Sequence, residues 1–149
     1  MTMPDTSRDN FILRLMRGDT PQHAIGATLG ARILALDLYA GRLEMAFVGT
    51  DAFLNPAGHV QGGILGAMLD DVTASLVTAT ATADERCATL DLHLSFLRPV
   101  LPGEVRASAK LVRRGREICN VQGELVQDGK VVATATATCM LVRATGRPA

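Results

Sequence analysis

Two adjacent carboxylates, Asp70 and Asp71, are the side chains in this sequence whose type and setting point most directly to chemistry. They are the only charged residues between Gly62 and Ala83. A helix with one face in water would carry many more charges, so the pattern predicts a helix that is mostly buried. A buried carboxylate is costly unless the protein uses it or a neighbour satisfies it. These two residues are therefore the first candidates for a functional site.

Helical spacing separates the two carboxylates. At 100° per residue, the large apolar residues share one arc that should face a sheet: Leu65, Met68, Leu69, Val72 and Leu76. Asp70 lies on the opposite arc, between the small residues Gly66 and Ala74, and such a face lets a backbone or a ligand come close. Asp71 lies about 100° further round the helix, where we expect it to be solvated.

A loop rich in turn-forming residues precedes this helix, with the sequence Asn55-Pro56-Ala57-Gly58-His59-Val60-Gln61 followed by Gly62-Gly63. Asn, Pro and Gly are common in turns, so one interpretation is a simple turn before a helix start. The free N–H groups and the dipole at a helix N-terminus also favour negative charge there.

Periodicity predicts the elements that position these residues. We expect a short helix over residues 8–17, capped by Asp5-Thr6-Ser7, then strands over 27–38 and 42–48. A long helix over 62–80 precedes four strands over 88–96, 104–113, 117–127 and 130–142. The order ββαββββ predicts an α+β fold in which an antiparallel sheet wraps around one central helix, in a single domain spanning residues 1–149.

Strict alternation in the segment 88–96 predicts a half-buried strand. One face carries the apolar residues Leu90, Leu92, Leu94 and Phe96, and the other carries Thr89, Asp91, His93 and Ser95.

Composition narrows the function classes. The net charge is zero and aromatic residues make up 3% of the chain, which argues against nucleic acid as a partner. Two central carboxylates make membrane insertion of the long helix unfavourable. Cys87, Cys119 and Cys139 have no CxxC spacing and are expected to be reduced thiols. The scattered histidines form no metal-ligand pattern. The first residues lack the features of a signal peptide, so we expect a cytoplasmic location.

The motif Asn55-x-x-Gly58-x-x-Gln61-Gly62-Gly63, followed by Asp70, resembles the signature of the hotdog-fold acyl-CoA thioesterases. The similarity is greatest to the subgroup named for the phenylacetate-degradation thioesterase, and it covers about residues 25–143. In that subgroup a His occupies the position of Gln61. A Gln still donates and accepts hydrogen bonds, but it does not titrate.

The resemblance implies a role for each matching residue. Asp70 would be the general base or the nucleophile, and the Gly62 backbone N–H would stabilise the thioester oxyanion. Asn55 would orient the water or the substrate. Gln61 would be a supporting group, and Thr89 stands where relatives often carry a Ser or Thr near the attacking water.

Further residues correspond to the substrate-binding part of the family's site. Gly63 is a candidate substrate contact. The basic cluster Arg113, Arg114 and Arg116 lies where relatives often bind the phosphates of coenzyme A. An ordinary solvated hairpin is the alternative for this cluster, because the residues flank a tight turn. His59 is not expected to replace the missing His, since a shift of two residues changes direction and depth.

Helix geometry adds a constraint on assembly. Gly62 and Asp70 are eight residues apart, which is roughly 12 Å along one helix. They cannot both reach one carbonyl group. If both act in one reaction, a two-fold dimer must combine Asn55 and Gly62 of one chain with Asp70 and Thr89 of the other. This agrees with the family, and we expect a homodimer that pairs into a dimer of dimers.

These observations predict an enzyme, an acyl-CoA thioesterase that releases CoA and a medium-chain or aromatic acid without a metal or redox cofactor. Asp70 could activate water or attack the carbonyl to form a mixed anhydride, and the sequence leaves both open. One alternative is a non-catalytic acyl-CoA-binding hotdog protein, and another is a purely structural dimer. A hydratase would need an Asp–His pair a few residues apart, which the sequence lacks around Asp70.

Overall fold

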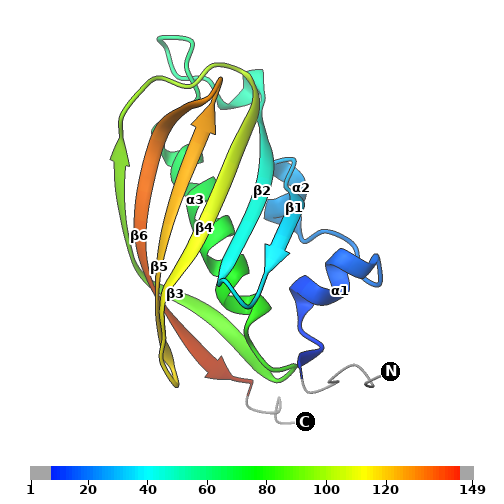
Figure 1. Cartoon of the computed structure of the whole chain (residues 1–149). Helices are drawn as coiled ribbons and strands as arrows, with labels where there is room; N and C mark the ends of the chain where they lie inside the picture. The colour runs from blue at the N-terminus through cyan, green and yellow to red at the C-terminus, as the bar shows by residue number, and fades with distance from the viewer. Residues whose placement is uncertain (1–7, 145–149) are drawn as a thin grey trace.

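Six antiparallel strands form one sheet that curves around a long helix in the computed structural model, which describes residues 8–144 (Figure 1). The strands are β1 Arg32–Asp37, β2 Arg42–Gly49, β3 Glu85–Phe96, β4 Gly103–Arg114, β5 Ile118–Gln127 and β6 Lys130–Arg143. The long helix is α3, Gly62–Ala79. This is the antiparallel sheet around a central helix that the sequence predicts.

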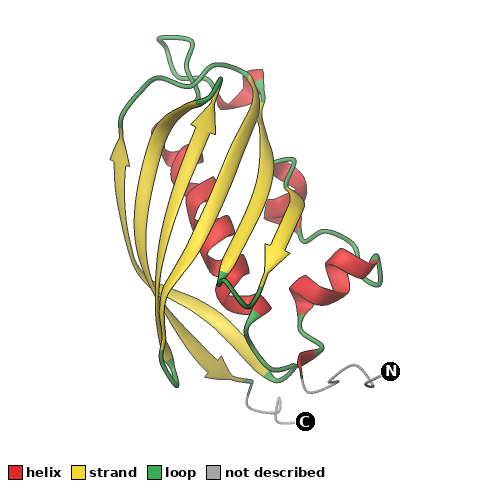
Figure 2. Cartoon of the chain, viewed as in Figure 1, coloured by secondary structure: helices red, strands yellow, loops and turns green. Residues whose placement is uncertain are grey.

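The order of the strands in the sheet is β1-β2-β4-β5-β6-β3, so β1 and β3 form its two edges. Helix α3 connects β2 near one edge to β3 at the other, and it lies across the concave face of the sheet (Figure 2). As a result, one side of α3 is presented to the edge strand β3.

The apolar arc of α3 fills the core. Leu65, Met68, Leu69, Val72 and Leu76 are all buried against the sheet, as the spacing predicts.

The small-residue face of α3 lies against side chains of β3. A Cβ added at Gly66 would lie 2.8 Å from Leu94 Cδ1, and one added at Gly62 would lie 3.3 Å from the Phe96 ring. Glycine at these positions therefore allows side chains of β3 to approach the helix.

The β5–β6 hairpin shows how local sequence determines a turn. Asp128 and Gly129 both have positive φ angles, 51° and 74°. Positive φ at both central residues is the requirement of a two-residue type I′ turn. A tight turn therefore joins the two strands at the residues that separate the predicted ranges 117–127 and 130–142.

The segment before β1 differs from the expectation of one strand over 27–38. A short helix, α2, spans Ala24–Thr28, and β1 begins only at Arg32. Gly30, with φ of 63°, reverses the chain between them. The strand pattern was wrong here because Ala27 N and Leu29 N bond to carbonyls one turn back.

The first helix, α1, spans Phe11–Arg17 and starts later than expected. Its N-cap is Asn10, whose side-chain oxygen accepts a hydrogen bond from Leu13 N. The predicted cap at Asp5-Thr6-Ser7 lies outside the described residues. No helix within residues 8–144 is long and apolar enough to cross a membrane.

Candidate active site

Asp70 lies in the middle of α3 and is half-buried beside the edge strand β3. Thr89 of β3 donates a hydrogen bond from Oγ1 to Asp70 Oδ1 over 2.8 Å. Among residues 8–144, the second carboxylate oxygen, Oδ2, has no hydrogen-bond donor. The carboxylate is thus held at one oxygen and has the other available for chemistry.

A β-bulge brings Thr89 to this position. In the pairing of β3 with β6, Thr89 lies opposite Cys139 and Asp91 lies opposite Thr138, so Leu90 is an extra residue in β3. A bulge changes which face the following side chains occupy. Thr89 therefore shares the helix-facing side with Leu92 and Leu94, whereas Leu90 is 57% exposed.

This arrangement corrects the predicted faces of β3. Strict alternation placed Thr89 with Asp91 on a polar face, and it placed Leu90 with Leu92 on the apolar face. The assignments of Thr89 and Leu90 are wrong, because strict alternation holds on each side of the bulge but not across it. The position of Thr89 beside the candidate carboxylate agrees with the family resemblance instead.

Asn55 organises the loop before α3. Its side-chain oxygen accepts hydrogen bonds from Ala57 N at 3.0 Å and His59 N at 3.1 Å. Its backbone N–H donates to the His59 carbonyl at 2.8 Å. The amide nitrogen Nδ2 has no acceptor in the described part of the chain. Asn55 therefore forms a turn, as the simple interpretation holds, while its side-chain amide N–H groups stay available.

The loop and the start of α3 border an open groove of about 420 Å³. Asn55, His59, Gly62, Phe96 and Arg98 are among the residues that line it. Within residues 8–144, the backbone N–H of Gly62 and that of Gly63 have no hydrogen-bond acceptor. The groove thus combines an amide group with free N–H groups at the N-terminus of an 18-residue helix, which is a favourable place for an oxyanion.

Gln61 and His59 are placed differently with respect to this groove. Gln61 is the N-cap of α3, is exposed, and makes no side-chain cap hydrogen bond. His59 is half-buried and lines the groove beside Asn55. Gly63 is exposed, and open space surrounds the position of a Cβ there.

The structure does not bring all candidate residues together within one chain. Asn55 and Gly62 share the groove, whereas Asp70 and Thr89 pair with each other and do not line it. Gly62 and Asp70 lie on the same helix, roughly 12 Å apart along its axis. One chain therefore carries two halves of the predicted site in two places.

Asp71 is not solvated, contrary to the expectation. Its side chain is only 9% exposed, and His23 Nε2 lies 3.2 Å from its Oδ1. Burial raises the pKa of Asp71, with Asp70 adding to the rise, while the charge and hydrogen bond of His23 oppose it. The helical projection was correct about direction, but the segment before β1 covers this side of α3.

The His23–Asp71 contact is an Asp–His pair that sequence reasoning missed. The two residues are far apart in the sequence, and a search for nearby pairs does not find them. Neither residue lines the groove of Asn55 and Gly62. The pair therefore does not support a hydratase site there.

The arginine cluster divides into two kinds of residue. Arg114 donates from Nε to Thr80 Oγ1 at 3.0 Å and also bonds to the Gly115 carbonyl. Arg113 and Arg116 are exposed and border a shallow groove of about 320 Å³ at the β4–β5 turn. This turn lies beside the C-terminal end of α3, at the opposite end of the helix from Gly62.

All three cysteines are free thiols, and Cys87 and Cys139 lie close to the Asp70–Thr89 pair. Cys119 and Cys139 are buried and Cys87 is half-buried. Cys139 Sγ lies 4.0 Å from Thr89 Oγ1. Hydrogen bonding between the Cys87 and Cys139 thiols raises the pKa of Cys87 and lowers that of Cys139 to about 7. Within residues 8–144, no three His, Cys, Asp or Glu side chains cluster in a way that could hold a metal ion.

Comparison with known proteins defines the class. The profile of the family described as acyl-CoA thioesterase N-terminal domain matches residues 51–140, which is more than half of the chain. The chain therefore belongs to the acyl-CoA thioesterase family with the hotdog fold and is a thioester hydrolase.

Individual relatives place it more closely. A crystal structure of a proposed thioesterase related to phenylacetic acid degradation, from Ralstonia eutropha JMP134, is 62% identical, with a TM-score of 0.87. The alignment covers 88% of this chain and 99% of that one. A proposed esterase of Saccharolobus solfataricus is 26% identical over 112 residues, which is 74% of this chain and 79% of the relative.

The fold is also that of the PaaI protein from the phenylacetic acid degradation operon of E. coli. That structure is 21% identical, has a TM-score of 0.77 and covers 95% of this chain and 96% of its own. The relative that is 62% identical places the chain in the subgroup resembling the phenylacetate-degradation thioesterase, as the motif indicates.

Proposed function

We propose that this protein hydrolyses a medium-chain or aromatic acyl-CoA to the free acid and CoA, with Asp70 as the acting carboxylate in a site shared by two subunits. The observation that carries the proposal is the hydrogen bond of 2.8 Å from Thr89 Oγ1 to Asp70 Oδ1. It fixes a half-buried carboxylate beside the edge of the sheet and leaves Oδ2 for the reaction.

Asp70 has two chemical routes. As a general base, Oδ2 takes a proton from water, the water oxygen attacks the thioester carbonyl, and the C–S bond breaks to release CoA thiolate. As a nucleophile, Oδ2 attacks the carbonyl and the C–S bond breaks, which releases CoA thiolate and leaves a mixed anhydride. Water then hydrolyses the anhydride to the free acid and restores the Asp70 carboxylate. Thr89 assists either route by holding Oδ1 in place.

The groove at the start of α3 supplies the complementary half. In both routes negative charge develops on the carbonyl oxygen. The Gly62 N–H is directed along the helix axis at its positive end, which stabilises this charge. The Asn55 amide nitrogen lines the same groove and is available to orient the substrate or the water. Gln61 and Gly63 flank these groups.

The free edge of the sheet favours a dimer that joins the two halves. Among residues 8–144, β3 has no neighbour on one side. Leu90 and Phe96 of β3 are 57% and 53% exposed, and Leu97, which follows it, is 54% exposed. An exposed apolar edge strand is a site for pairing with another chain. We propose that two copies of β3 pair about a two-fold axis, and that such dimers pair again.

The register of this pairing follows from the two halves. Thr89 marks the carboxylate half and Phe96 borders the oxyanion groove. A two-fold axis between Leu92 and His93 would place Thr89 of one chain opposite Phe96 of the other. Each dimer then contains two complete sites, as isologous symmetry requires.

The exposed Arg113 and Arg116 suit the nucleotide end of the substrate. Guanidinium groups bind phosphates in bidentate fashion, and these two residues have no acidic partner within residues 8–144. Their distance from the reacting groups fits a long substrate such as acyl-CoA.

The test is a panel of acyl-CoAs of different chain length, including aromatic ones, with released CoA measured by a thiol-trapping dye. We expect turnover with a preference within the panel, and a loss of at least about 100-fold in kcat for Asp70→Asn. Tight binding of acyl-CoA with negligible turnover by the unmodified protein would contradict the proposal and favour a binding protein.

A further inference from the structure

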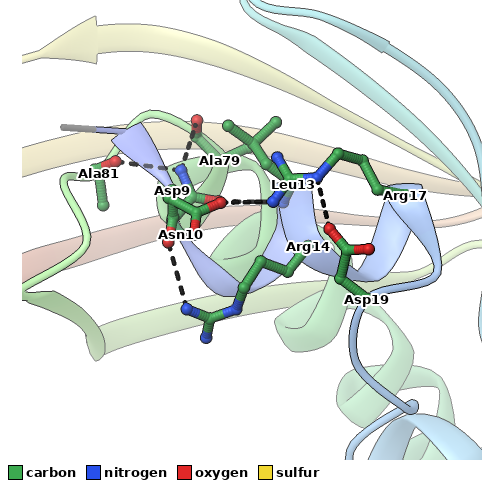
Figure 3. Close-up of polar contacts among 8 residues, drawn as sticks. All are labelled: Asp9, Asn10, Leu13, Arg14, Arg17, Asp19, Ala79 and Ala81. Carbon is green, nitrogen blue, oxygen red and sulfur yellow. Dashed lines mark hydrogen bonds and ion pairs between the residues drawn. The ribbon is translucent and has the colours of Figure 1, made fainter. Parts of the chain in front are cut away.

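Beside the apolar packing of α1 on α3, Asn10 and His23 make polar side-chain contacts to α3 and the turn that follows it. At the end of the helix, Asn10 Nδ2 donates to the Ala79 carbonyl at 3.2 Å and to the Ala81 carbonyl at 3.0 Å (Figure 3). At the middle of the helix, His23 Nε2 lies 3.2 Å from Asp71 Oδ1. One contact therefore secures the end of α3, and the other secures the residue next to Asp70.

The imidazole of His23 is held firmly within its own segment. His23 is the N-cap residue of α2, and its backbone N–H donates to Gln22 Oε1 at 3.1 Å. Phe11 packs edge-on against its ring, with the ring centroids 5.5 Å apart. A Cβ added at Gly26 would lie 2.6 Å from Gln22 Cδ and 2.8 Å from His23 Cε1, so glycine lets both side chains pack close to α2.

The His23–Asp71 pair attaches this segment to α3 at a high cost in desolvation free energy. Asp71 is 9% exposed, and within residues 8–144 its Oδ2 and His23 Nδ1 are buried without a hydrogen-bond partner. Desolvating a charged pair can outweigh the attraction between its members. Apolar residues would join the two surfaces at lower cost, so stability alone does not account for the pair.

The position of the pair suggests what it does. Asp70 and Asp71 are adjacent and point in directions about 100° apart. β3 holds the first through Thr89, and residues 8–31 hold the second through His23. At this level α3 is therefore fixed from two sides, which determines its rotation about its own axis.

We propose that His23 is a positioning residue, which acts through Asp71 to hold Asp70 on the Thr89 hydroxyl. The inference rests on the proposed function, in which Asp70 acts on the thioester. Catalysis is sensitive to such placement, since a displacement of about 1 Å in an active site can reduce the rate on the order of 100-fold.

The first test compares His23→Ala, His23→Gln and the control Asn10→Ala, each with kcat, KM and thermal unfolding. His23→Ala should lower kcat about tenfold and change KM less than about twofold, because the substrate contacts remain. His23→Gln keeps an N–H donor for Asp71 and should recover at least half of the kcat. Asn10→Ala removes the other anchor and should lower Tm while leaving kcat within about twofold.

Some results of this kinetic comparison would contradict the proposed role of His23. A folded His23→Ala protein with unchanged kcat would overturn the inference. Equal losses of kcat in His23→Ala and Asn10→Ala would do the same, because the segment would then act only through general stability. Failure of His23→Gln to recover activity would also contradict a role based on its hydrogen bond.

A second measurement does not depend on turnover. Urea unfolding of His23→Ala, Thr89→Ala and the double variant forms a double-mutant cycle. The inference predicts that the combined effect on the unfolding equilibrium constant departs at least about threefold from the product of the single effects. In the matched cycle, Asn10→Ala takes the place of His23→Ala. There the combined effect on the unfolding equilibrium constant should equal the product of the two single effects.

This cycle separates the two possible failures. Absence of turnover in the unmodified protein would remove the proposed function, and coupling in the cycle would still show that His23 holds the Asp70–Thr89 contact. Independent effects of His23 and Thr89 would overturn the inference whether or not the enzyme turns over acyl-CoA.

Discussion

Thr89 Oγ1 lies 2.8 Å from Asp70 Oδ1, although the alternation of β3 would direct Thr89 to the other face of the sheet. The extra residue Leu90 resolves this, because a bulge lets Thr89 and Leu92 share one face. The contact joins the centre of the long helix to the edge strand. It is the local feature on which the proposed chemistry depends most.

Replacing the Thr89 hydroxyl tests that contact. Thr89→Val keeps the shape of the side chain but removes the donor, and Thr89→Ser keeps the donor. A hydrogen bond to a charged group contributes about 1.5–3 kcal/mol, so kcat should fall about 10- to 100-fold in Thr89→Val. Thr89→Ser should stay within about threefold. Steady-state hydrolysis of the best acyl-CoA measures both, and equal kcat values for all three proteins would exclude a role for the hydroxyl.

Asp71 should limit stability at neutral pH. Burial raises its pKa above the ordinary value of 3.8. The folded state therefore favours the protonated carboxyl, and this stabilising contribution is present below the ordinary pKa and lost as pH rises through the raised one. Asp71→Asn resembles the neutral form and still accepts a hydrogen bond from His23.

We expect Asp71→Asn to have a higher urea midpoint than the unmodified protein at pH 7 and the same midpoint near pH 3. Its kcat should change less than about threefold, in contrast to Asp70→Asn. Chemical denaturation across this pH range checks the sign. A lower midpoint at pH 7 would mean that the ion pair with His23 outweighs the cost of burial.

Local patterns predicted most of the fold. The helix over 62–80 and the strands that follow match the structure within three residues at each end, because alternation and helical spacing are properties of neighbouring residues. The bulge at Leu90 depends on pairing between β3 and β6. The alternation of apolar and polar residues along β3 gives no sign of it.

The candidate site could be predicted only in part. The motif identified Asn55, Gly62 and Asp70, and the distance along the helix predicted that one chain would not bring them together. The burial of Asp71 was missed because His23, far away in the sequence, covers it. Contacts of this kind arise from tertiary packing, which a single sequence does not reveal.

The arginine residues should affect binding rather than chemistry. Replacing Arg113 and Arg116 together by Ala should raise KM for acyl-CoA roughly tenfold and leave kcat unchanged, because the contact is uniform through the reaction. The effect should shrink at high salt. Arg114 is excluded from the pair since it bonds to Thr80.

A truncated substrate provides the control for this experiment. An acyl-pantetheine lacks the nucleotide, so its KM should not respond to the Arg113 and Arg116 changes. Replacement of the exposed Arg42 and Lys110 on the outer face of the sheet removes equal charge elsewhere and should leave both KM values unchanged. Equal responses to the two substrates would show that the cluster is only a hairpin tip.

The cysteines should be unreactive in the folded protein. The thiolate is the reactive form, and the raised pKa of Cys87 keeps this half-buried thiol protonated at neutral pH. Cys139, whose pKa is about 7, is fully buried. An aromatic disulfide reagent at pH 7.5 should therefore modify less than one thiol per chain within minutes in the folded protein. After unfolding it should modify three thiols per chain. Immediate reaction of all three in the folded protein would be inconsistent with this packing.

The shared site can be tested by mixing two inactive variants. Asp70→Asn removes the acting carboxylate. Asn55→Asp removes the amide N–H groups but keeps an oxygen for the turn that binds Ala57 N and His59 N. In a mixed dimer of these chains, one site receives both defects and the other receives neither.

Co-expression of the two variants with different affinity tags, followed by purification of mixed dimers and measurement of acyl-CoA hydrolysis, is the most direct test of the account. Dimer symmetry predicts recovery to about half of the unmodified activity per mixed dimer, while each variant alone stays nearly inactive. Mixed dimers that remain as inactive as the two parents would contradict a site built from two chains.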